Sequence, residues 1–186
     1  PEELQRICEM FALTVDALEE NPNQDFLGDL FMRFDLGNTW KGQFFTPYCI
    51  CRMMSSLTAD DLKAQVEEKH WVHSHDPACG AGATLIAFAN ECKDQGVNYQ
   101  TSALFVAQDI DRTAALMCYV QLSLLGCPGY VVVGDSICNP VTGPMLFPQC
   151  REGQEIWYTP MFFSDIWICR RQIEIMRSIC EKGEPA

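Results

Sequence analysis

The chain has 186 residues, 48% hydrophobic and 20% charged, so it is long and apolar enough to fold as one globular domain with a buried core. Its net charge of −12 argues against a protein that grips DNA or RNA over a wide surface by itself, because such binding needs many Lys and Arg contacts to phosphates. No apolar run reaches membrane-spanning length and no signal-peptide pattern opens the chain, so we expect a cytoplasmic protein without a membrane partner. Because the first residue is Pro1 rather than Met, we also expect a fragment or a trimmed chain.

Cysteine usage indicates a reducing compartment. The chain has eleven cysteines, an odd number, and none of them form a C-x-x-C pair or a zinc-finger spacing. Cys118, Cys127 and Cys169 stand within apolar runs, where a reduced cysteine acts as a small hydrophobic residue. A disulfide scaffold is the less favoured alternative.

The first forty residues predict a helical lead. Apolar residues recur mostly at three- and four-residue steps over residues 2–20, as in an amphipathic helix, and residues 21–23 (NPN) end it. A second helix is expected from residue 24 to about residue 36, with a stop at residues 37–38 (GN). Core packing explains both helices, so we assign residues 1–40 to the lead and residues 41–186 to the functional core.

The following segment predicts two more helices through its capping residues. Residues 42–47 have the sequence GQFFTP, in which Thr46 is a natural N-cap and Pro47 suits the first position of a helix that runs to about residue 56. Thr58 is expected to cap another helix over residues 59–69, with Asp61 three residues later in a pattern close to a capping box.

Residues 72–83 (VHSHDPACGAGA) are the stretch around which the chain is organised. They predict a strand that ends at Asp76, a tight turn with Gly80 and Gly82, and a helix that begins near Ala83. Glycine permits positive φ and lets a ligand approach the backbone, and the first amides of a helix are free hydrogen-bond donors. The alternative is a tight turn without a ligand, which any α/β protein can contain.

Three histidines precede this turn in an H-x-x-H-x-H pattern, at positions 70, 73 and 75. Metal binding is conceivable, but no acidic or cysteine ligand is clearly placed to complete a set, so we predict no metal site.

The remaining chain alternates strands and helices. We expect strands at residues 102–107, 129–133 and 155–158, helices at residues 112–125 and 164–182, and a proline-containing loop at residues 139–148. Such alternation predicts a parallel sheet, and ligands bind at the carboxyl ends of its strands. Asp76, Asp109 and Asp135 follow three successive strands and should therefore meet at one edge. The alternative for each one singly is a helix N-cap.

Together these segments resemble the adenine-specific (N6) DNA methyltransferases, most closely the modification subunits of type I restriction-modification systems. Residues 42–47 resemble the family's N-terminal cofactor segment, and residues 76–82 (DPACGAG) its cofactor-binding turn. Residues 108–111 (QDID) and 134–136 (GDS) are similar to the next two motifs, and residues 24–36 to the helix before the first. The resemblance covers residues 24–163.

The resemblance implies a fold, a cofactor and a set of contacts. The fold would be a Rossmann-like methyltransferase core of three α/β/α layers, with about four mainly parallel strands in the order 3-2-1-4. The cofactor would be S-adenosyl-L-methionine, held by Asp76 and the glycine turn at its methionine end, by Asp109 at its ribose and by Asp135 at its adenine. The implied cofactor-binding residues are Phe44, Phe45, Thr46, Pro47, Asp76, Ala78, Cys79, Gly80, Ala81, Gly82, Asp109, Ile110, Asp135 and Ser136.

The sequence departs from the family where methyl transfer should occur. The family has Asn or Asp, Pro, Pro and an aromatic residue after the fourth strand, to hold and stack on the flipped base. Residues 139–142 (NPVT) have the asparagine but come before the fourth strand, whereas residues 159–162 (TPMF) follow it without the asparagine. We therefore predict Thr159, Pro160 and Phe162 as a degenerate catalytic motif.

Two functions fit this sequence best. The first is S-adenosylmethionine-dependent methylation of DNA at adenine N6, with DNA bound weakly or through a partner such as a specificity subunit or a second copy. The second is a cofactor-binding module that has lost catalysis and serves regulation or assembly. An α/β domain of another nucleotide-binding class is the third.

Overall fold

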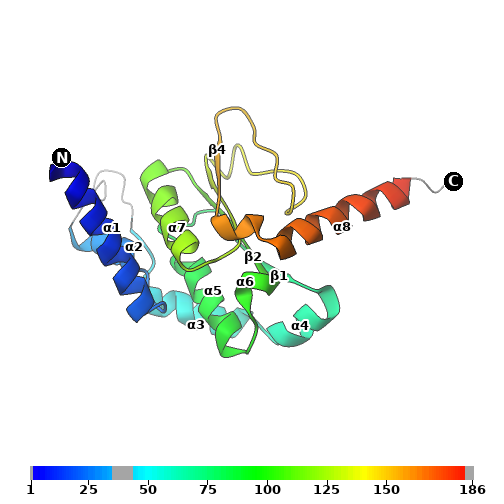
Figure 1. Cartoon of the computed structure of the whole chain (residues 1–186), viewed down its shortest axis with the longest axis horizontal. Helices are drawn as coiled ribbons and strands as arrows, with labels where there is room; N and C mark the ends of the chain where they lie inside the picture. Colours follow the sequence, from blue (N-terminus) through cyan, green and yellow to red (C-terminus); the bar gives the residue numbers. More distant parts are fainter. Residues whose placement is uncertain (1, 35–43, 183–186) are drawn as a thin grey trace.

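The computed structural model describes residues 2–34 and 44–182. Its helices are α1 (Glu2–Glu20), α2 (Phe26–Arg33), α3 (Tyr48–Thr58), α4 (Leu62–Lys69), α5 (Ala83–Asp94), α6 (Tyr99–Ser102), α7 (Arg112–Leu124), the 3-10 helix η2 (Pro160–Phe163) and α8 (Asp165–Lys182). Its strands are β1 (Val72–Asp76), β2 (Ala103–Asp109), β3 (Gly129–Val133) and β4 (Glu155–Tyr158). Figure 1 shows α1 and α2 on one side of the sheet region, and α8 projecting from the other. Gly42 and Gln43, the predicted stop at residues 37–38 and the tail at residues 183–186 lie outside the described residues.

The four strands form one sheet in the order β1-β2-β3-β4. β1 pairs with β2 and β2 with β3 in parallel, with Asp76 opposite Ala107 and Asp109 opposite Val133. Because these three strands run the same way, their carboxyl ends lie at the same edge of the sheet. The predicted Rossmann-like α/β fold with a mainly parallel sheet of four strands is confirmed.

The predicted strand order 3-2-1-4 is wrong. β4 pairs with β3, not with β1, and it runs antiparallel, with Tyr158 opposite Tyr130 and Glu155 opposite Val133. The reason lies in residues 134–154, which contain no helix. A parallel neighbour needs a crossover that is usually helical, whereas an antiparallel neighbour needs only a returning loop. Within the part of the chain that the structure describes, β1 is consequently an edge strand.

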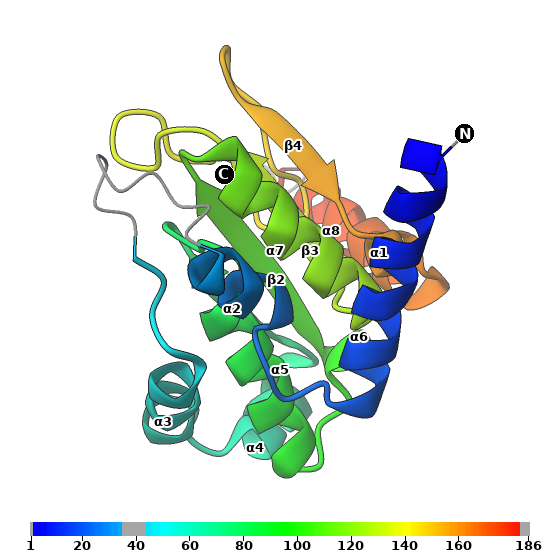
Figure 2. The ribbon, with the colours of Figure 1, turned by 90° about the vertical axis from the view of Figure 1, so that its left-hand side faces the viewer.

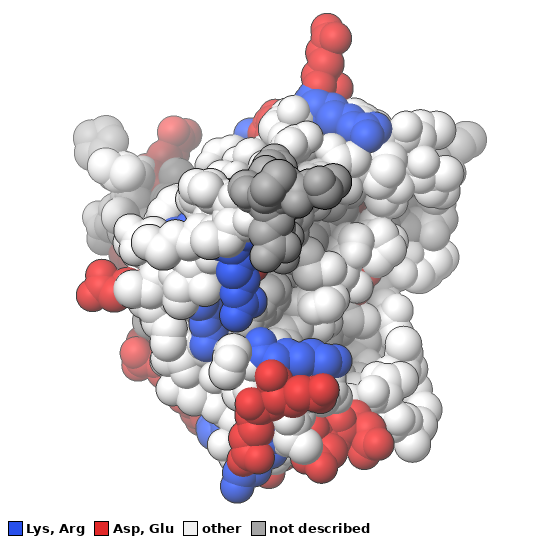
Figure 3. Space-filling view, turned by 90° about the vertical axis from the view of Figure 1, so that its right-hand side faces the viewer, with Lys and Arg blue, Asp and Glu red and all other residues white. Residues whose placement is uncertain are grey.

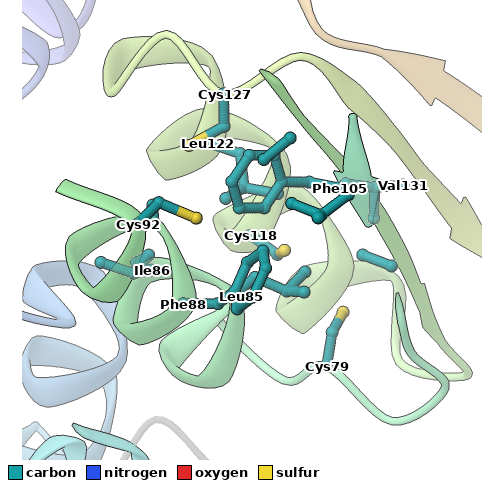
Figure 4. Packing of buried hydrophobic residues seen from close by; sticks show 14 of the residues in the cluster. Cys79, Leu85, Ile86, Phe88, Cys92, Phe105, Cys118, Leu122, Cys127 and Val131 are labelled. Carbon is teal, nitrogen blue, oxygen red and sulfur yellow. The ribbon is translucent and has the colours of Figure 1, made fainter. Parts of the chain in front are cut away.

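The sheet is covered differently on its two faces. β1, β2 and β3 follow one another in a single direction, so their right-handed connections place α5 and α7 on the same face. Phe105 of β2 packs there with Leu85, Leu122 and Val131, as Figure 4 shows. On the opposite face Leu104 and Val106 of β2 pack with residues of η2, α8 and the loop before β4, namely Leu146, Phe162 and Trp167.

The N-terminal helices form an outer layer on the α5 and α7 side. α2 contacts α7, α1 contacts α2, and α3 contacts α5. Figure 2 shows α2 in front of the sheet, α1 on the right and α3 at the lower left. Backbone Leu27 N donates a hydrogen bond of 3.1 Å to Oε1 of Gln121 on α7, which ties the lead to the core. The boundary near residue 40 stays a prediction.

Two predicted caps are wrong. Pro47, not Thr46, is the N-cap residue of α3, and no side chain caps this helix. α3 continues to Thr58, whose hydroxyl donates to the carbonyl of Met54, and the Asp61 side chain caps α4 by accepting from Ala64 N. The start of α3 is thus shifted by one residue and that of α4 by three, because α3 continues through Thr58 and local capping signals do not fix a helix boundary to the residue.

Cys118 and Cys127 are buried in the core as predicted, but Cys169 is exposed on α8. Among residues 2–34 and 44–182, no helix combines the length and apolar character that crossing a bilayer requires.

Candidate functional site

A crevice of about 500 Å³ opens at the carboxyl end of β1. Its walls come from β1, the turn before α5, the first half of α5, helix α3 with the segment before it, and the N-cap of α2. A volume of this order is typical of small-molecule sites, which span about 300–1,000 Å³. The lining residues are Asp25, Phe44, Phe45, Thr46, Cys51, Met54, Ser55, Thr58, Ser74, His75, Asp76, Ala78, Cys79, Gly80, Ala81, Ala83, Thr84 and Phe88.

The turn between β1 and α5 requires its two glycines. Gly80 has φ of +54° and Gly82 has φ of +101°, both in the region that side chains disfavour. A Cβ on Gly80 would lie 3.1 Å from the ring of Phe45, and a Cβ on Gly82 would lie 2.9 Å from Sγ of Cys118. The sequence therefore lets Phe45 and α7 approach the turn backbone from opposite sides.

Asp76 and Asp109 hold this turn in place. Oδ1 of Asp76 accepts from Ala78 N at 3.0 Å, and its Oδ2 accepts from the Thr84 hydroxyl on the first turn of α5. Oδ2 of Asp109, at the end of β2, accepts from Gly80 N at 2.8 Å. The two carboxylates thus lie on either side of the turn, although Asp109 itself does not line the crevice.

Asp135 lies at the same edge of the sheet, one strand further on. Its Oδ1 accepts from the amides of Cys138 and Ile137, at 2.9 and 2.8 Å. These backbone hydrogen bonds lower the pKa of Asp135 below its usual value, so the side chain is ionised at neutral pH. Neither Asp135 nor Ser136 lines the crevice, and Ile110 stands 72% exposed beside Asp109.

The segment before α3 closes one side of the crevice. The Phe45 ring stacks on Phe31 of α2 with centroids 5.4 Å apart and covers Gly80. Phe44 and Thr46 also line the crevice, whereas Pro47 does not. Eight of the fourteen predicted cofactor-binding positions are therefore crevice-lining: Phe44, Phe45, Thr46, Asp76, Ala78, Cys79, Gly80 and Ala81.

A buried hydrogen-bond network that links α2, α7 and the glycine turn was not predicted. Gln121 of α7 is fully buried, and its Nε2 donates to Oδ1 of Asp25 at 2.7 Å and to the carbonyl of Ala81 at 2.9 Å. Burial raises the pKa of Asp25, which is the N-cap of α2. A glutamine within an otherwise apolar helix was the sequence signal, but its partner is far away in the chain.

The predicted catalytic residues are not brought to the crevice. β4 runs antiparallel, so Thr159 lies beside the beginning of β3, at the opposite edge of the sheet from Asp76. The Thr159 hydroxyl is fully buried, donates to the carbonyl of Cys127 at 2.7 Å and accepts from Gly129 N at 3.0 Å. Phe162 is 3% exposed, and Pro160 opens η2. The structure therefore gives Thr159 and Phe162 packing roles and offers no support for a catalytic one.

The other candidate, Asn139, lies on the correct edge of the sheet. Its backbone N donates to the carbonyl of Asp135, two residues after β3. Its side-chain Nδ2 donates to the carbonyl of Glu152 at 3.2 Å and thus holds the loop before β4. Asn139 does not line the crevice.

Two of the arginines of α8 pack against aromatic rings. Arg170 lies 4.6 Å from the centre of the Trp167 ring, and Arg171 lies 4.2 Å from that of Phe162. On the face drawn in Figure 3, Lys and Arg side chains lie next to Asp and Glu side chains and form no broad basic surface. Among residues 2–34 and 44–182, no three His, Cys, Asp or Glu side chains are placed together to hold a metal ion.

Comparison with known proteins gives one match. The sequence model described as N-6 DNA Methylase matches residues 24–156, which is more than half of the chain. No curated protein and no solved structure matches. The matched range begins just before α2 and ends within β4, so it includes every wall of the crevice.

Proposed function

Because the chain belongs to the N-6 DNA methylase family, we propose that it binds S-adenosylmethionine in the crevice and serves methylation of DNA at adenine N6. The family relationship supports a DNA methyltransferase-like function. The cofactor, the target atom and the residues that hold them are our proposal. The observation that best supports this proposal is the glycine turn, which hydrogen bonds to Asp76 and Asp109 hold at the carboxyl edge of a parallel sheet.

The crevice fits the proposed cofactor in size and chemistry. Its volume of about 500 Å³ accommodates a nucleoside with an amino-acid side arm. The absence of a Cβ at Gly80 lets the Phe45 ring lie against the turn, and both residues line the crevice. The cofactor, when bound, supplies an activated methyl group. The chain's own residues would orient it, with Asp76 and the turn at its methionine end. Outside the crevice, but at the same edge of the sheet, Asp109 would lie toward its ribose, and Ile110, Asp135 and Ser136 toward its adenine.

We further propose that the residues that hold the target adenine come from a partner, either a specificity subunit or a second copy of this chain. No described residue brings the family's acceptor motif to the crevice, and the net charge of −12 does not favour DNA binding by this chain alone. β1 is an edge strand, and its residues Ser74 and His75 line the crevice. A partner that pairs with this open edge would stand beside the bound cofactor.

A second candidate function is a cofactor-binding module without catalysis. The burial of Thr159 favours it, because a hydroxyl engaged with Cys127 and Gly129 is not free to hold a base. This module would keep the crevice and use the cofactor as a regulatory ligand.

Two measurements test these proposals in sequence. Isothermal titration with S-adenosylmethionine should show binding at micromolar to low millimolar concentrations, which Asp76→Ala should weaken. An absence of binding at millimolar concentrations refutes both functions. Tritiated methyl transfer to unmethylated DNA, with candidate partners added, then separates the enzyme from the module. Incorporation that Asp135→Ala abolishes supports the enzyme, and binding without incorporation in any combination supports the module.

A further inference from the structure

Asp25 is a nearly buried carboxylate in the crevice wall with one oxygen still available. The residue is 3% exposed and lines the crevice. Its Oδ1 accepts from Gly28 N at 3.0 Å and from Nε2 of Gln121 at 2.7 Å. Within residues 2–34 and 44–182, no donor bonds to its Oδ2. Oδ2 is not one of the fully enclosed side-chain atoms that lack a partner, so it remains open to a donor from the crevice.

The packing around Asp25 keeps this carboxylate in place. A Cβ on Gly28 would clash with Oδ2, so the glycine allows the carboxylate to lie against the first turn of α2. Gln121 links the same carboxylate to the carbonyl of Ala81. Asp25 is therefore fixed beside the glycine turn, where the proposed function locates the methionine end of the cofactor.

The charge of the crevice wall is unbalanced. Asp25 and Asp76 are the acidic residues among the lining side chains, and these include no Lys or Arg. Burial raises the pKa of Asp25, in agreement with a carboxylate that no protein cation compensates. A ligand with a positive group would remove this imbalance, whereas its own carboxylate would need backbone amides, such as those that open α5.

We propose that Oδ2 of Asp25 accepts a hydrogen bond from the ammonium group of the bound S-adenosylmethionine and so fixes the methionine end of the cofactor. This inference rests on the proposed cofactor site and adds a binding residue to it. A capping role alone would explain the contact of Oδ1 with Gly28, but it does not explain why Asp25 lines the crevice or why the lining carries no cation.

The test compares two ligands and three proteins. S-adenosylhomocysteine carries the ammonium group and a neutral sulfur, and its deaminated analogue differs only in the absence of that group. Asp25→Asn keeps an oxygen for Gly28 and Gln121 and is an equally good N-cap, but it removes the charge. Asp29→Asn is the matched control, because it removes an exposed carboxylate from the same helix. Affinities come from calorimetric titration, and thermal unfolding reports whether each variant is folded.

We expect Asp25→Asn to lower the affinity for S-adenosylhomocysteine by about tenfold to a hundredfold, the usual effect of losing a charge-assisted hydrogen bond. The affinity for the deaminated analogue should change by no more than about twofold. Asp29→Asn should change neither affinity. Equal weakening of both ligands would show that Asp25 acts only through the structure, and unchanged binding of both would show that it makes no contact; either result overturns the inference and leaves the cofactor site standing. If the wild-type chain binds neither S-adenosylmethionine nor S-adenosylhomocysteine, the proposed function itself fails.

Discussion

Gly82 is the position of the turn that should tolerate a side chain least. Its φ is +101°, and a Cβ there would lie 2.9 Å from Sγ and 3.5 Å from Cα of Cys118. Alanine in a left-handed conformation costs about 1–2 kcal/mol. Overpacking against a buried neighbour adds about 1–3 kcal/mol. We therefore expect Gly82→Ala to lower the free energy of unfolding by about 2–5 kcal/mol, a large share of the 5–15 kcal/mol or so that stabilises a typical domain.

Two further variants separate these contributions. Gly96 has φ of +75° and no atom within 4 Å of the position of a Cβ, so Gly96→Ala reports the backbone cost with little steric cost. Cys118→Ala removes the Sγ that the new methyl group would meet. In the Gly82→Ala background it should return about 1–3 kcal/mol, although it costs stability in the wild-type chain.

The assay is urea unfolding followed by tryptophan fluorescence, with free energies from linear extrapolation. The reasoning is refuted if Gly82→Ala is no less stable than Gly96→Ala. It is also refuted if the losses from Gly82→Ala and Cys118→Ala simply add, because the contact between α7 and the turn would then not exist as described.

Three further predictions concern stability and binding. Asp25→Asn should raise the melting temperature at neutral pH, because a raised pKa in the folded state means that ionised Asp25 opposes folding. This increase in melting temperature should shrink as the pH falls through the folded-state pKa toward the ordinary pKa of an aspartate, and an increase that does not depend on pH would contradict the prediction. Thr159→Val should lower the free energy of unfolding in urea by about 1–3 kcal/mol, because the buried carbonyl of Cys127 and amide of Gly129 lose a partner. Loss of transferase activity at unchanged stability would instead indicate a catalytic role. Phe45→Ala should lower the affinity for S-adenosylmethionine by about tenfold in calorimetric titration, because contacts of the ring with the ligand worth about 1–2 kcal/mol are lost. Phe34→Ala, at an exposed position, is its control, and equal affinities for both variants would show that Phe45 does not cover the ligand.

The turn and its flanking elements were predictable because their signals are local. Gly80 and Gly82 report a backbone that needs positive φ, and the apolar run after them reports the buried face of α5. Asp76 and Asp109 end β1 and β2, and Asp135 lies two residues after β3, so parallel pairing alone brings them to one edge. None of these inferences needs a contact between distant parts of the chain beyond the sheet itself.

The strand order and the buried hydrogen bond between Asp25 and Gln121 were missed because they depend on distant parts of the chain. The order was transferred from the family resemblance, whereas the absence of a helical pattern between β3 and β4 already favoured an antiparallel return. Asp25 was visible as part of a family-like segment, but nothing in its neighbourhood indicates that Gln121 would reach it. Pairs of this kind are fixed by packing, which a single sequence does not encode locally.

The position of β4 decides how this chain can take part in methyl transfer. Thr159 is at the amino end of β3 and the crevice edge is at its carboxyl end, so the five residues of β3 separate them by roughly 16 Å at about 3.3 Å per residue. Transfer requires the reacting atoms to approach within about 3–3.5 Å. No side-chain rotation spans that difference, and the hydroxyl of Thr159 is bound to backbone on both of its sides. Thr159 is therefore too far from the crevice to hold an adenine there, which supports our proposal that a partner supplies the groups that do.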